Sequence, residues 1–156
     1  LLLGIAIIPY PDLVFLDEPT TGLDPQARRN FWALIERIKS EKTTVVLTTH
    51  YMDEAELLCD EIAIMDHGRI LEQDSPARLL DKHFDGAVIT IPPPDDEARL
   101  PEGARLVNGH VEIEAANIDT TVKQLLSSHT NLDGLNIHKP DLEDLFIKLT
   151  GSSLRA

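Results

Sequence analysis

The stretch Leu13-Val14-Phe15-Leu16-Asp17-Glu18-Pro19 decides how this chain of 156 residues folds. Its four consecutive apolar residues predict a short strand that is buried on both faces, as in a parallel sheet covered by helices. Two carboxylates follow at once, and Pro19 ends the strand. Because ligands of open α/β sheets bind at the carboxyl ends of the strands, Asp17 and Glu18 are the first candidate site residues.

The carboxylate pair suits a site that cleaves a phosphate bond. Asp17 can hold a hydrated Mg²⁺ on nucleotide phosphates, and Glu18 can polarise the attacking water. The same pair also fits a strand that ends in a polar turn with two solvated acids. The pair alone does not decide between these interpretations.

A histidine strengthens the catalytic interpretation. Thr49-His50 lies at the end of the next predicted strand, Thr43–Thr49. A parallel neighbour would bring His50 to the same sheet edge as Glu18. An imidazole there could bind a γ-phosphate and orient Glu18 and the water. Taken by itself, His50 also fits an ordinary histidine at a strand end.

Helix and strand patterns alternate around this stretch. Asp24-Pro25 predicts a helix start, with Asp24 as N-cap and an apolar face from Ala27 to Ile38. Alternation of this kind predicts an α/β fold with a mainly parallel sheet. The further elements expected in this half are a continuous apolar helix or strand at Leu1–Ile8, a short helix at Met52–Leu58, a hairpin around His67-Gly68 and a helix that begins at Ser75-Pro76.

The texture of the sequence changes near His83–Gly86, which predicts two domains, residues 1–84 and residues 85–156. The second half predicts a small α+β domain. Its expected elements are a strand at Ala87–Ile91, a hairpin around Asn108-Gly109, a helix at Ile118–Ser128, a strand at Leu135–His138 and a helix at Asp141–Leu149 closed by Gly151.

Composition excludes several classes of function. The net charge of −13 is spread over both halves and argues against nucleic-acid binding, which needs clustered Lys and Arg. The apolar runs are too short to span a bilayer, so direct membrane insertion is not expected. Cys59 is the single cysteine, which excludes an internal disulfide. His110, His129 and His138 lack metal-ligand spacing.

Residues 13–72 closely resemble ATP-binding cassette (ABC) ATPases. LVFLDEP resembles the family's Walker B motif with its catalytic glutamate, GLDP resembles its D-loop, and Thr49-His50 resembles its switch histidine. Residues 48–70, TTHYMDEAELLCDEIAIMDHGRI, are similar to the branch of exporters that includes drug, antibiotic and polysaccharide efflux cassettes. The fold implied is part of a P-loop NTPase-type sheet layer followed by the accessory domain.

The resemblance implies a role for each matching residue. Asp17 would act on Mg²⁺ through water, Glu18 would be the general base, and His50 would contact the γ-phosphate. Asp24 would communicate across a head-to-tail dimer that sandwiches each ATP between two cassettes. The implied cofactors are therefore ATP and Mg²⁺. The implied partners are a second copy and a transmembrane permease at the cytoplasmic face of the cell membrane.

The sequence also departs from the family pattern. It contains no G-x-x-x-x-G-K-[ST] loop, no glutamine loop and no Leu-Ser-Gly-Gly-Gln signature. In the family, the signature leads directly into a helix like Leu1–Ile8. The chain is therefore expected to be a C-terminal fragment of an exporter ATPase that is inactive alone and binds ATP poorly.

Residues 85–156 resemble the accessory C-terminal region of many exporter cassettes, and the ending PDLEDLF at residues 140–146 is similar to one common in that branch. This region implies regulation or dimer contact, although a plain structural appendage fits as well. The main alternative for the whole chain is a non-catalytic dimerisation or regulatory module. A cassette protein that works without a transporter is disfavoured by the exporter-like switch region.

Overall fold

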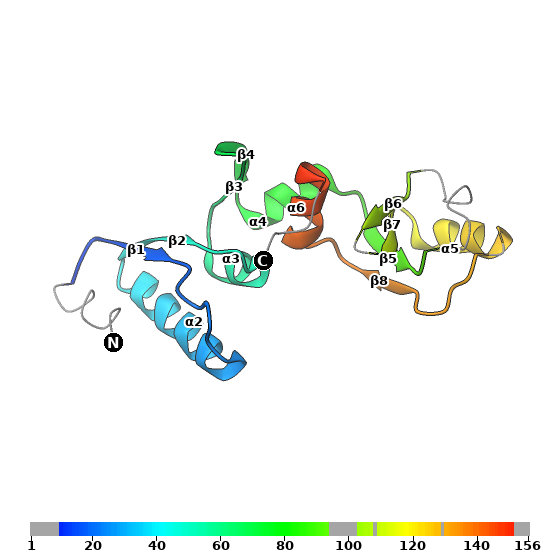
Figure 1. Cartoon of the computed structure of the whole chain (residues 1–156). Coiled ribbons are helices and arrows are strands. Elements are labelled where there is room, and N and C mark those ends of the chain that lie inside the picture. Colours follow the sequence, from blue (N-terminus) through cyan, green and yellow to red (C-terminus); the bar gives the residue numbers. More distant parts are fainter. Residues whose placement is uncertain (1–9, 94–102, 108, 129, 152–156) are drawn as a thin grey trace. The chain divides into compact units, whose positions relative to one another are not determined.

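The computed structural model describes residues 10–93, 103–107, 109–128 and 130–151 (Figure 1). The apolar segment expected at Leu1–Ile8 lies outside these residues. The chain divides into two packing units, Leu1–Asp60 and Glu61–Ala156. Each unit is described by itself below.

The first unit contains the parallel strand pair that the sequence predicts. Strand β1, Leu13–Asp17, lies beside β2, Thr44–Thr48, in parallel register, and the α2 helix, Pro25–Ser40, connects them (Figure 1). The register pairs Asp17 with Thr48 at the carboxyl ends of both strands. The predicted α/β fold is confirmed. Among the described residues, β1 and β2 are the only strands that pair in parallel.

The α2 helix begins where the sequence predicts. Asp24 has extended backbone angles, and its Oδ1 accepts hydrogen bonds from the backbone N–H groups of Gln26 (2.9 Å) and Ala27 (2.8 Å). Pro25 occupies the first helical position, where no N–H is needed. These contacts fix the start of α2 directly after the strand-end loop.

One face of the β1–β2 pair packs on a buried apolar cluster, which includes Ile35 and Ile38 of α2 together with Leu58 of the α3 helix, Met52–Leu58. The other face is open among the described residues: Phe15 is 73% exposed and Leu13 46%. The prediction that β1 is buried on both faces is therefore wrong for this part of the structure. The helix of this βαβ unit covers one face of the strands, so alternate side chains of β1 differ in burial.

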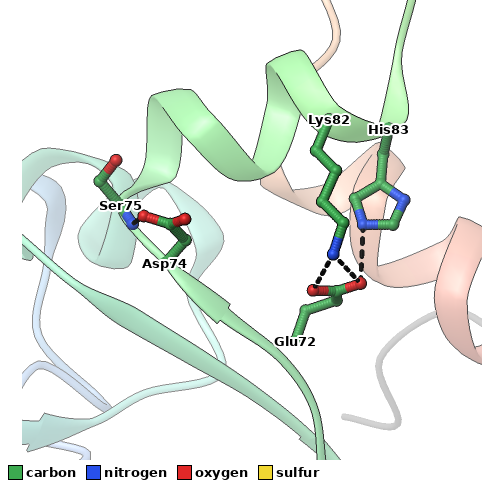
Figure 2. A network of polar contacts seen from close by, with 5 residues as sticks. All are labelled: Glu72, Asp74, Ser75, Lys82 and His83. Carbon is green, nitrogen blue, oxygen red and sulfur yellow. Dashed lines mark hydrogen bonds and ion pairs between the residues drawn. The ribbon is translucent and has the colours of Figure 1, made fainter.

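The second unit begins with the predicted hairpin. Strands β3, Ile62–Asp66, and β4, Arg69–Asp74, are antiparallel and turn at His67-Gly68, both with positive φ. The α4 helix, Pro76–His83, follows. Glu72 of β4 accepts bonds from Lys82 Nζ at 2.7 and 2.8 Å, and His83 Nε2 lies 3.1 Å from its Oε1 (Figure 2). These contacts of Glu72 connect the hairpin to α4.

A four-stranded antiparallel sheet forms the rest of the unit, in the order β6-β7-β5-β8. Its buried cluster includes Ile89, Ile91, Val111, Ile113 and Leu125. The predicted α+β character is confirmed. The bounds of these elements are β5, Ala87–Ile91; β6, Arg105–Val107; β7, His110–Ala115; α5, Ile118–Ser127; β8, Asn136–His138; and α6, Leu142–Thr150.

The α6 helix returns to the start of this sheet. Lys148 Nζ donates a hydrogen bond to the carbonyl of His83 at 2.5 Å and lies 4.4 Å from the ring centroid of Phe84. The same ammonium group pairs with Glu114 at 2.7 Å. A single side chain therefore joins the end of α4, strand β7 and the last helix.

Gly86 should tolerate no side chain. Its φ is +96°, and a Cβ there would lie 2.2 Å from the carbonyl oxygen of Ala115. We expect Gly86→Ala to lower the free energy of unfolding by roughly 2–4 kcal/mol in urea titration, because backbone strain adds to a clash with a strand. Gly68→Ala is the control, since φ is also positive but the space is open. Equal losses for both variants would contradict the clash.

The Glu72 contact predicts a pH dependence of stability. Hydrogen bonding from Lys82 lowers the pKa of Glu72 from its ordinary value of 4.5. Its contribution to folding is therefore present above that value and is lost as the pH falls through the lower native pKa. We expect Glu72→Gln to lower the urea midpoint of unfolding at neutral pH. In acid, the midpoints of the variant and the parent should lie closer together. Asp81→Asn, an exposed change on α4, is the control, and its difference in urea midpoint from the parent should not shrink in acid.

Candidate functional site

The carboxyl ends of β1 and β2 form a polar edge. The Thr48 hydroxyl donates a short hydrogen bond to Asp17 Oδ1, and the backbone N–H of Glu18 donates to the carbonyl of Thr48 at 2.9 Å. The strand register thus fixes both the Asp17 side chain and the position of Glu18. Asp17 and Thr48 offer a carboxylate and a hydroxyl oxygen, the hard oxygen ligands that Mg²⁺ takes.

Glu18 lies where the backbone leaves the strand. Its φ of 42° is in the left-handed region, which is uncommon for a residue other than glycine. Strain of this kind persists when the surroundings determine it, and it is frequent at functional sites. The turn directs the carboxylate to two partners: Thr21 Oγ1 lies 3.3 Å from Oε2, and His50 Nδ1 lies 3.3 Å from Oε1.

The Glu18–His50 pair remains open to solvent. The side chains are 50% and 35% exposed, respectively. An exposed carboxylate with an imidazole at hydrogen-bond range can take part in proton transfer or orient a water molecule. The sheet therefore brings together two of the predicted site residues in a geometry that fits this chemistry.

Asp24 has a different setting. Its Oδ1 is engaged in capping α2, and in the part of the chain that the structure describes Asp24 forms no hydrogen bond or ion pair with Asp17, Glu18 or His50. The same residue that resembles a D-loop aspartate thus has a structural role at the start of the helix.

Sequence reasoning missed the residues that support His50. The ring of Tyr51 contacts the His50 ring, with centroids 4.2 Å apart, and the Arg28 guanidinium lies 4.1 Å from the Tyr51 centroid. Nearby, Trp32 Nε1 donates to Glu54 Oε1 at 3.0 Å, and Glu54 is fully buried. Arg28 and Trp32 are four residues apart, so helical spacing places them on one face of α2.

A second polar cluster lies in the C-terminal unit. His138 Nε2 is 3.1 Å from Asp144 Oδ2, and Asp141 and Asp144 form a capping box at the start of α6. Burial raises the pKa of Asp144. One ligand atom from each of the three residues falls within 4.8 Å of the others. The capping box accounts for the two carboxylates, so this cluster has a structural explanation.

Comparison with known proteins identifies relatives along almost the whole chain. Nod factor export ATP-binding protein I of Burkholderia lata is 35% identical over 99% of this chain and 52% of that protein. The proteins of the same name from Paraburkholderia xenovorans and Bradyrhizobium diazoefficiens are each 36% identical with the same coverage. The chain spans about half the length of the curated relatives it matches.

Two other similarities cover less of the chain. A family model described as "AAA domain", and linked in that description to a "Type IV TA system", matches residues 1–52. Among solved structures, cbiO1 from Clostridium perfringens, described as part of the ABC transporter complex cbiONQ, is 34% identical. That match covers 46% of this chain and 29% of that protein, with a TM-score of 0.41.

No helix within the described ranges is long and apolar enough to cross a membrane. Over almost its whole length the chain is similar to proteins whose name joins export with ATP binding, which agrees with the resemblance of its motifs to ATP-binding cassette ATPases.

Proposed function

We propose that this chain is the C-terminal part of the ATP-binding subunit of an ABC-type exporter, and that it supplies the hydrolytic edge of the nucleotide site. The observation that carries this proposal is the Glu18–His50 contact of 3.3 Å at the ends of two parallel strands. The relatives' name, which joins export with ATP binding, supports it.

Each residue of the edge has a proposed task. Glu18 accepts a proton from, or polarises, the water that attacks the γ-phosphate, while His50 orients Glu18 and donates to a γ-phosphate oxygen. Asp17, fixed by Thr48, holds the water shell of Mg²⁺. When bound, Mg²⁺ neutralises charge on the phosphate oxygens. Asp24 contacts a second cassette, although its carboxylate also caps α2.

The proposed assembly follows from the family. Two cassettes bind ATP between them, close, and reopen after hydrolysis, and this cycle drives a transmembrane permease at the cytoplasmic face of the membrane. We propose that residues 1–84 belong to the ATPase domain and residues 85–156 to an accessory domain. The separate apolar core of the antiparallel sheet supports a distinct domain there. It also favours the second candidate function, a dimerisation or regulatory module.

Glu18→Gln tests the catalytic assignment in a cassette of full length that carries these residues. We expect kcat for ATP hydrolysis to fall about 100-fold or more, because the amide cannot accept a proton, whereas MgATP binding is retained. Glu56→Gln, an exposed change on α3, is the matched control and should leave turnover unchanged. Turnover that survives Glu18→Gln would reject the assignment and favour the module.

The 156-residue chain alone should bind MgATP weakly. Its sequence has no G-x-x-x-x-G-K-[ST] loop, so it lacks the backbone N–H cradle and the lysine that grip the phosphates. In isothermal titration we expect no saturable binding in the micromolar range. Micromolar affinity in that titration would show that the 156 residues bind the nucleotide without a phosphate-binding loop.

A further inference from the structure

The histidine of the proposed site is one member of a stack of side chains. The Tyr51 ring lies against the His50 ring at 4.2 Å between centroids, with the planes tilted by 40°. Arg28 of α2 places its guanidinium carbon over the Tyr51 ring, 4.1 Å from the ring centroid. Because His50 Nδ1 is 3.3 Å from Glu18, the contacts run without a break from α2 to the strand-end acid.

Arg28 has an unusual environment for a charged residue. Its Nε atom is buried and has no hydrogen-bond partner among the described residues. The guanidinium lies over the aromatic face of Tyr51, where the negative quadrupole of the ring attracts a cation. Arg28 is partly buried, and its Nε makes no hydrogen bond among the described residues. We therefore infer that its main contribution is the contact with the Tyr51 ring.

Both ends of the stack are anchored. The backbone N–H of Arg28 donates to the carbonyl of Asp24 at 2.9 Å, so Arg28 is fixed in the capped first turn of α2. The backbone N–H of Tyr51 donates to Thr49 Oγ1 at 3.0 Å, which closes a turn around His50. The backbone is thus hydrogen-bonded at both ends of the stack, and the His50 ring contacts Tyr51 and Glu18.

The stack is separate from the contacts that hold the two helices together. Trp32 donates to the fully buried Glu54, and Lys39 Nζ donates to the carbonyl of Leu58 at 2.6 Å. These contacts join α2 and α3 without Arg28. Removing the guanidinium should therefore release the ring of Tyr51 while the helix pair remains packed.

We propose that Arg28 is a positioning residue that acts through Tyr51 to hold the imidazole of His50 beside Glu18. The predicted effect of Arg28 on kcat rests on the proposed function. The geometric part, Arg28 setting the orientation of His50, does not depend on ATP hydrolysis.

The test uses a cassette of full length with Arg28→Met, which removes the charge and keeps the length of the side chain. We expect kcat to fall about tenfold with an unchanged KM for MgATP, because misplaced catalytic groups affect the chemical step. Arg28→Lys, which retains a cation for the ring, should recover part of kcat. Arg29→Met is the matched control, since its guanidinium is exposed and donates to Gln26.

The second readout is the imidazole resonance of His50 in nucleotide-free protein. It should shift in Arg28→Met and Tyr51→Leu and stay unchanged in Tyr51→Phe and Arg29→Met, because the phenylalanine ring preserves the stack. If Arg28→Met does not fold, Tyr51→Leu provides the same two measurements. An unmoved resonance, or a change in KM alone, would overturn the inference.

The two proposals fail in different ways. If Glu18→Gln leaves hydrolysis intact but the His50 resonance shifts in Arg28→Met, the proposed function is wrong and the positioning contact stands. If Glu18→Gln abolishes hydrolysis while Arg28→Met leaves both kcat and the resonance unchanged, the positioning inference is wrong and the proposed function stands.

Discussion

The pairing of β1 with β2 is the constraint on which the candidate site depends. Parallel register places Asp17 opposite Thr48, and the bond from the Glu18 N–H to the Thr48 carbonyl extends that register by one residue. A slip of one position would move every side chain to the opposite face of the strand. His50, two residues beyond Thr48, would then no longer meet Glu18. The chemistry proposed for this edge therefore depends on backbone hydrogen bonds as much as on its side chains.

Much of the fold can be predicted from local patterns, because the signals that start and end each element are strong. Asp24-Pro25 predicts a capped helix, His67-Gly68 a hairpin, and Gly151 a left-handed helix end with φ of 71°, and each is confirmed. The meeting of Glu18 and His50 is likewise predictable, since it needs only two parallel strands that end at one edge.

The supporting contacts could not be predicted in the same way. Arg28 and Tyr51 are distant in sequence, and their stacking depends on the rotation of α2 about its axis. The burial of Glu54 against Trp32 runs against the usual exposure of glutamate. His138 shows no metal-ligand spacing, yet the capping box of α6 brings Asp144 to it. Tertiary packing decides the contacts of Arg28 and Glu54, whereas the His138 contact depends on the local turn into α6.

The left-handed backbone at Glu18 has a consequence for variation at this position. Two independent demands fall on one residue: the turn favours glycine, asparagine or aspartate, whereas the proposed reaction needs the reach of a glutamate carboxylate. Residues that adopt this turn without strain have side chains shorter than glutamate. β-Branched residues satisfy neither demand. Positive φ also occurs at Tyr10, Lys42 and His67, so the backbone conformation by itself does not mark a functional residue. At position 18 the proposed reaction adds a demand on side-chain length that the turn does not impose.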